Sequence, residues 1–165
     1  MNSIFHRISV RSFTDQVVEK EKIIKIIQAG MQTPSAGNQQ PWEFYVVEDE
    51  SIIQQLATIS PYAGCVVHAK TVIVSVYRKE IKFPEFTQID LSIAQENMWL
   101  ETDALGLGGV WLGVTPIQTI EIGIAYLDDL TPAAKCFLPV LKEMVDVLWN
   151  STPNVPSWLV SLFFL

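Results

Sequence analysis

The chain has 165 residues, of which 49% are hydrophobic and 18% charged, with a formal net charge of −7. This length and composition predict a single globular domain whose core needs no disulfides. The acidic balance excludes a general nucleic-acid binder, which needs a basic face. Two cysteines and two histidines are too few for a disulfide framework or a histidine-rich metal centre, so we expect no metal site.

The N-terminal residues MNSIFHRISV lack the apolar run of a signal peptide. No apolar run approaches the ~20 residues that a membrane-spanning helix needs. We therefore expect a cytoplasmic protein with no membrane partner. The apolar end WLVSLFFL is short, and we expect it to be buried or covered by a partner.

Hydrophobic periodicity predicts alternating helices and strands through most of the chain. In chain order we expect a helix over residues 15–32, a strand over 43–48, a short helix over 50–59, a central strand buried on both faces over 71–77, a loop over 82–86, a long helix over 88–105, a strand over 110–114 and a weak helix over 117–127. The apolar stripe of the first helix is formed by Ile23, Ile24, Ile26 and Ile27. This order favours an α+β or α/β sandwich, in which helices cover a sheet.

The stretch RISVRSF, residues 7–13, gathers positive charge near the start of an acidic chain. If it is extended, Arg7, Ser9 and Arg11 lie on one side, because side chains alternate along an extended backbone. Two guanidiniums and a hydroxyl can clamp a phosphate, since a guanidinium offers forked donors to anionic oxygens. A solvated surface arm is the alternative, and on these residues alone it is the commoner structure.

Two later segments have the composition of ligand-binding loops. PSAGNQQPW, residues 34–42, predicts turns between a helix and a strand, and its amides suit the polar edge of a heteroaromatic ring. LGLGGVWLG, residues 105–113, has the glycines of a nucleotide loop, but they follow a helix and open a strand, which excludes a Rossmann fingerprint. Glycines at a strand start still let a flat ligand lie against the backbone. Local capping and packing are the alternative for both segments.

In this order, the three segments together resemble the nitroreductase family of flavin enzymes. Residues 7–13 match the family's Arg-x-Ser-x-Arg-x-Phe opening, and residues 34–42 match Pro-Ser-x-x-Asn-x-Gln-Pro-Trp. Residues 90–113 match a long helix that ends in Gly-Leu-Gly before a Trp-containing strand. The resemblance implies one α+β sandwich domain over residues 1–165, with a mainly antiparallel sheet flanked by helices, that forms an intertwined homodimer.

The same resemblance implies one FMN at each subunit interface and a set of residues that bind it. These are Arg7, Ile8, Ser9 and Arg11 at the phosphate and ribityl chain, Pro34, Ser35 and Ala36 from the partner subunit, Asn38 and Gln40 near the flavin edge or supporting the loop, and Gly109, Val110 and Trp111 at the ring. Electrons from NADH or NADPH would pass through the flavin to a small-molecule acceptor, a nitro compound or quinone, by a ping-pong mechanism. No protein side chain is expected to be catalytic, because the flavin carries the chemistry.

From about residue 118 the sequence departs from the family. It has no Pro-x-Gly-Tyr-type strand, and Lys135 and Lys142 are the only cations of residues 131–165. We expect a strand near residues 137–141 and a helix near 142–149. Divergence, truncation or a frame shift would explain the change. The functional alternatives are therefore another redox reaction on the same fold, or a flavin-binding protein with little catalysis.

Overall fold

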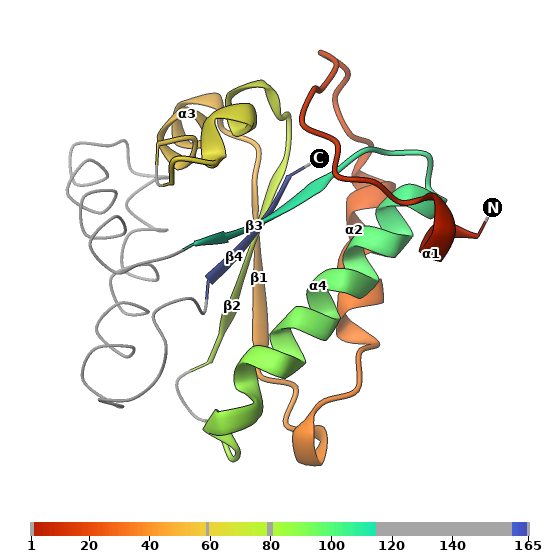
Figure 1. Ribbon diagram of the computed structural model, residues 1–165, viewed down its shortest axis with the longest axis vertical. Coiled ribbons are helices and arrows are strands. Elements are labelled where there is room, and N and C mark those ends of the chain that lie inside the picture. Colours follow the sequence, from red (N-terminus) through yellow and green to blue (C-terminus); the bar gives the residue numbers. More distant parts are fainter. Residues whose placement is uncertain (1, 59, 79–80, 115–159, 165) are drawn as a thin grey trace.

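The computed structural model describes residues 2–58, 60–78, 81–114 and 160–164, which form a sheet with helices on both faces (Figure 1). The helices are α1 (Ser3–His6), α2 (Lys20–Met31), α3 (Glu50–Leu56) and α4 (Thr87–Ala104). Short 3₁₀ turns are η1 (Ala36–Asn38), η2 (Ala63–His68) and η3 (Pro84–Phe86). The strands are β1 (Trp42–Val47), β2 (Val72–Tyr77), β3 (Val110–Val114) and β4 (Val160–Phe164).

The described strands pair antiparallel in the order β1-β2-β4-β3. Strand β2 lies between β1 and β4, and all of its residues except Tyr77 are buried. Its side chains alternate between the faces, so that Val72 and Val74 pack with α3 while Ile73 packs with α2 and α4. The central strand, buried on both faces, is therefore confirmed.

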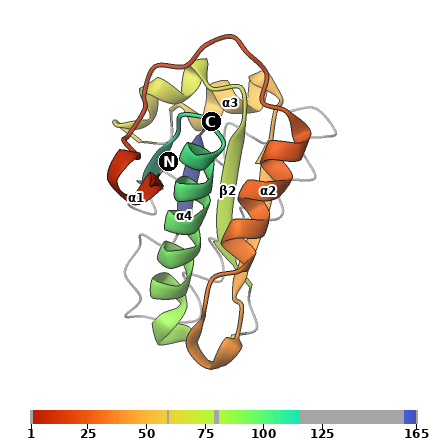
Figure 2. The same cartoon turned by 90° about the vertical axis from the view of Figure 1, so that its right-hand side faces the viewer.

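Helices α2 and α4 lie side by side on one face of the sheet, and α3 lies on the other (Figures 1 and 2). Helices α2 and α4 can pack closely because residue 30 is glycine; a Cβ there would lie 2.9 Å from Met98 Cγ. The long helix and the strand that the sequence predicts after residue 87 are confirmed, with bounds that agree to within one residue. Helix α4 is the element that positions the site.

The first long helix begins later than the sequence predicts. Helix α2 starts at Lys20 rather than Asp15, because Glu19 keeps an extended backbone with φ −66° and ψ 133°. Val18 lies in the segment before α2, and its side chain is buried in the core beside Ile26 without being part of the helix. The apolar stripe is also narrower than expected, since Ile24 is 46% exposed. Helix α3 similarly ends at Leu56, before the expected residue 59.

The apolar end of the chain enters the sheet, where the sequence predicts no strand. Strand β4 pairs with β2 on one side and with β3 on the other. Valine and phenylalanine favour extended backbone, and pairing on both sides satisfies its N–H and C=O groups. The elements expected over residues 117–127, 137–141 and 142–149 lie outside the described residues. No described helix has both the length and the apolar character needed to cross a membrane.

Candidate functional site

The N-terminal arm, residues 7–11, lies against the glycine segment that opens β3. Ser9 and Gly109 form a parallel bridge, and the Val10 N–H donates to the Gly109 carbonyl at 3.0 Å. Gly108 leaves room for this contact, because a Cβ there would lie 2.9 Å from both γ carbons of Val10. Two of the three segments singled out in the sequence are therefore in direct contact.

Arg7 is held on the C-terminal half of α4. Its guanidinium carbon lies 3.8 Å from the centroid of the Trp99 ring, and its Nε lies 3.5 Å from Glu96 Oε1. Trp99 Nε1 donates to the Gly109 carbonyl at 3.1 Å, so the arm, α4 and β3 meet at one residue. Arg11 is exposed, with Nη1 3.5 Å from the Ser9 carbonyl. The two guanidiniums thus flank Ser9 on an arm docked beside β3.

A hydrogen-bonded pair that the sequence did not single out fastens α1 to the end of α4. His6 Nδ1 lies 2.7 Å from Asp103 Oδ1. The hydrogen bond from His6 lowers the pKa of Asp103 below its usual value, and the nearby charge of Arg7 adds to this effect. The arm is therefore anchored just before Arg7 by this pair and after it by Gly109.

The loop of residues 34–41 adopts an unusual backbone conformation. Gly37, Asn38 and Gln40 have left-handed φ angles of 53°, 54° and 46°. Glycine is needed at residue 37, because a Cβ would lie 2.4 Å from the Phe83 ring. Asparagine tolerates this region, whereas glutamine rarely adopts it. The loop shape must therefore be imposed by its surroundings.

Two side chains hold the C-terminal half of this loop. Ser35 Oγ accepts from the Gln40 N–H at 2.9 Å, which assigns Ser35 a structural contact within the loop. Arg78 Nη2, after the end of β2, donates to the carbonyls of Gln39 at 2.8 Å and Gln40 at 2.7 Å. The left-handed Gln40 is thus held at both its N–H and its carbonyl.

Helix α4 holds the other half of the loop through a buried acid. Asp90 Oδ1 accepts from the Ala36 N–H at 3.0 Å, and Asp90 Oδ2 accepts from Gln39 Nε2 at 2.8 Å. Gln39 also bonds the backbone of Phe83, with Nε2 donating to its carbonyl at 3.1 Å and Oε1 accepting from its N–H at 2.9 Å. Sequence reasoning missed these contacts, although an acid in the first turn of an apolar helix was a signal.

The arm and the loop lie at opposite ends of α4 (Figure 1). His6 contacts Asp103 near the last turn of the helix, and Ala36 contacts Asp90 in the first. At a rise of 1.5 Å per residue, these two acids are about 20 Å apart along the axis. One chain therefore brings the arm and the glycine segment together but leaves the loop away from them.

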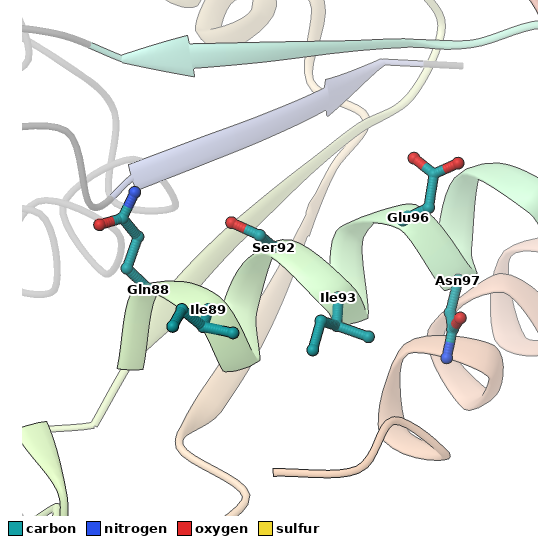
Figure 3. Close-up of a pocket in the computed structure, with 6 residues that line it drawn as sticks. All are labelled: Gln88, Ile89, Ser92, Ile93, Glu96 and Asn97. Atoms are coloured by element: carbon teal, nitrogen blue, oxygen red, sulfur yellow. The ribbon is translucent and has the colours of Figure 1, made fainter. Parts of the chain in front are cut away.

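Between these two ends, the outer face of α4 carries an open groove of about 510 Å³ (Figure 3). Its lining residues are Gln88, Ile89, Ser92, Ile93, Glu96 and Asn97. Ile89 and Ile93 are 55% and 39% exposed. The groove thus has an apolar middle, and Glu96 connects it to Arg7 of the arm.

Strand β3 supplies the remaining candidate residues. It lies at the edge of the described sheet, with Gly109 and Val110 buried and Trp111 half-buried. Trp111 Nε1 is buried and has no hydrogen-bond partner within the part of the chain that the structure describes. Leaving such a donor unpaired is costly, so its partner would come from a ligand, from another chain or from residues outside the described part of this chain. The described residues contain no group of three acidic, histidine or cysteine side chains that could hold a metal ion.

Comparison with known proteins decides the family. The model of the "Nitroreductase family" matches residues 4–63. A relative from Methanothermobacter thermautotrophicus, named "Putative NADH dehydrogenase/NAD(P)H nitroreductase", is 36% identical over 128 residues, which cover 77% of this chain and 67% of the relative. The chain belongs to the nitroreductase family.

Solved structures agree with a nitroreductase fold. A "Putative NADH Oxidase" from Clostridium acetobutylicum is 38% identical with a TM-score of 0.72, and the match covers 98% of this chain and 85% of that one. A "putative nitroreductase in complex with fmn" from Desulfovibrio desulfuricans is 27% identical with a TM-score of 0.70, covering 98% and 82%. The α+β fold with an antiparallel sheet, expected from the resemblance to nitroreductases, is confirmed.

Proposed function

We propose that this nitroreductase-family chain is an FMN-dependent oxidoreductase that takes electrons from NADH or NADPH and passes them to nitro compounds or quinones. The observation that carries the proposal is the docked arm, which sets Arg7, Ser9 and Arg11 beside the start of β3. The FMN named in the Desulfovibrio relative supports this choice of ligand.

The residues present fit FMN. Two guanidiniums and the Ser9 hydroxyl suit a phosphate, and the unpartnered Trp111 indole N–H suits an acceptor on a heteroaromatic ring. Arg7 and Arg11 would hold the phosphate, while the backbone from Ile8 to Ser9 and from Gly109 to Trp111 would orient the rest. The chemistry that FMN supplies when bound is two-electron transfer from nicotinamide to acceptor. Donor and acceptor would use the site in turn, which predicts ping-pong kinetics.

The complete site needs a second copy of the chain. Pro34, Ser35 and Ala36, with Asn38 and Gln40, lie on a loop that one chain keeps at the far end of α4 from its own arm. A partner lying along the outer face of α4 would cover the exposed Ile89 and Ile93 and bring its loop to this arm. We therefore infer a homodimer with an FMN at each interface, in which residues 1–165 act as one domain.

The test is the affinity for FMN of two charge-removing variants. Arg7→Ala should weaken binding by about 10- to 100-fold, since a charge-assisted hydrogen bond contributes about 1.5–3 kcal/mol. Lys20→Ala, at the exposed start of α2, is the matched control and should bind FMN as the unmodified chain does. Titrating flavin-free protein and following the flavin fluorescence measures both. Equal affinities of the two variants would show that the arm is not the phosphate clamp.

A further inference from the structure

We propose that Asp90 and Arg78 are positioning residues that hold the loop of residues 34–41 in the shape it presents to the flavin. The inference rests on the proposed function, but it concerns residues outside the proposed contacts with FMN. It follows from the hydrogen bonds that the two charged side chains make to polar groups of the loop.

Asp90 accepts hydrogen bonds from one backbone N–H and one side-chain amide of the loop. Its side chain lies in the first turn of α4, the residue is 3% exposed, and each carboxylate oxygen accepts one bond, from the Ala36 N–H and from Gln39 Nε2. A buried carboxylate is costly unless its oxygens are hydrogen-bonded. Because Asp90 Oδ2 accepts this bond, Gln39 turns Nε2 toward it. Gln39 Oε1 is then free to accept from the Phe83 N–H.

Arg78 holds the carbonyl groups. It donates from Nη2 to the carbonyls of Gln39 and Gln40, and its own N–H donates to the Pro41 carbonyl at 2.7 Å. Gln40 is a non-glycine residue with positive φ directly before a proline, a combination that costs free energy. Such backbone persists only where several contacts fix it. At Gln40 those contacts come from Arg78 and from Ser35 Oγ, while Asp90 fixes the neighbouring backbone at Ala36 and the side chain of Gln39.

The arrangement separates two parts of the proposed site. The arm that would bind phosphate lies further along α4, where Arg7 contacts Glu96 and Trp99, about 9 to 14 Å from Asp90 along the axis. Loss of Asp90 should therefore alter how Pro34, Ser35 and Ala36 meet the flavin ring while the phosphate clamp remains intact. A side chain that merely stabilised the fold would weaken both parts together.

The experiment compares Asp90→Asn and Arg78→Gln with Glu101→Gln in the full-length chain. Glu101→Gln is the matched control, because it removes one carboxylate from the same helix, about 16 Å beyond Asp90 along the axis. Five quantities are measured: FMN affinity, competition by inorganic phosphate, the visible spectrum of bound FMN, its reduction potential, and hydrogen exchange of the Ala36 and Gln40 amides.

For Asp90→Asn we expect exchange at Ala36 to speed up and FMN affinity to fall, each by about tenfold, the effect of one buried hydrogen bond. The spectrum and potential of bound FMN should shift, and inorganic phosphate should compete as well as before. Arg78→Gln should change exchange at Gln40 in the same direction. Because Arg78 is exposed, this variant keeps the test decisive if Asp90→Asn does not fold.

Variants that match Glu101→Gln in exchange, affinity and spectrum would overturn the inference. So would a loss of phosphate competition in Asp90→Asn, because it would indicate general damage to the fold. An unmodified chain that binds no FMN would instead overturn the proposed function. In that case the Ala36 exchange rate still decides whether Asp90 orders the loop, and an unchanged rate would overturn that part as well.

Discussion

At the scale of single residues, the arm is held in place by the Gly109 carbonyl. It accepts from the Val10 N–H and from Trp99 Nε1, so one oxygen joins the arm to α4. The approach is possible because Gly108 has no side chain where Val10 packs. The position of Arg7 and Arg11, and with it the proposed phosphate clamp, therefore depends on a glycine outside the proposed contacts with FMN.

Gly108→Ala should displace the arm and weaken FMN binding. The added Cβ would lie 2.9 Å from both γ carbons of Val10, and overpacking of this kind costs about 1–3 kcal/mol, or roughly 5- to 100-fold in affinity. Gly113→Ala is the control on the same strand, because a Cβ there meets nothing within 4 Å. FMN titration of both variants checks this. Matching affinities would contradict the docking seen at Gly108.

Acid should loosen the arm through Asp103. Its pKa is lowered in the folded chain from the usual 3.8, chiefly by the hydrogen bond from His6, so the pair stabilises the docked arm above about pH 4. That contribution is lost as the pH falls through the lowered folded pKa. We expect hydrogen exchange at Val10, corrected for its intrinsic rate, to rise in this acid range. Asp103→Asn should lack this step, and the same step in both proteins would exclude the pair as its source.

At the scale of elements, α4 has three roles. Its inner side packs into the core through Leu91, Ala94 and Met98, its last turns hold the arm, and its first turn holds the loop. The sequence predicted this helix because its apolar spacing is regular and glycines follow it. The predicted start of α2 was wrong, since Val17 and Val18 continue the helical pattern although Val18 packs into the core from the segment before the helix.

The contact between α2 and α4 can be tested at Gly30. A Cβ there would lie 2.9 Å from Met98 Cγ and 3.1 Å from the Phe44 ring, so Gly30→Ala should lower the free energy of unfolding by about 1–3 kcal/mol. Shortening Met98 to alanine removes the obstruction, and the double variant should lose less stability than the sum of the single ones. Urea unfolding of the four proteins measures this. Additive losses would show that the helices do not meet at this pair.

At the scale of the molecule, the sequence predicted most strands of the sheet and singled out the arm, but it did not predict the contacts that hold the loop. The central strand follows from the β-branched run of residues 71–77, and β1 and β3 lie at or within one residue of the predicted strands 43–48 and 110–114. The bonds from Asp90 and Arg78 to the loop join residues about 40 to 50 positions apart, which local periodicity cannot reveal. Strand β4 was missed for a similar reason, because its place depends on pairing with both β2 and β3.

The division of the candidate site between the two ends of α4 is also a property of the whole molecule. Within one chain, the arm is anchored toward the C-terminal end of α4 and the loop at its N-terminal end, so the two do not lie together. In the flavin site proposed above, which uses both, a second chain would supply the loop, and binding should then depend on the assembled protein rather than on the arm alone.

The most direct measurement is an anaerobic titration of the purified full-length chain, loaded with FMN, by NADH and by NADPH. We predict that the protein takes up FMN, that one of the two donors bleaches its flavin absorbance, and that adding a nitro compound or quinone restores it. Bound FMN that neither donor bleaches would favour a different redox reaction on this fold. Protein that stays colourless and takes up no added FMN would contradict the assignment of this chain as a flavin-dependent oxidoreductase.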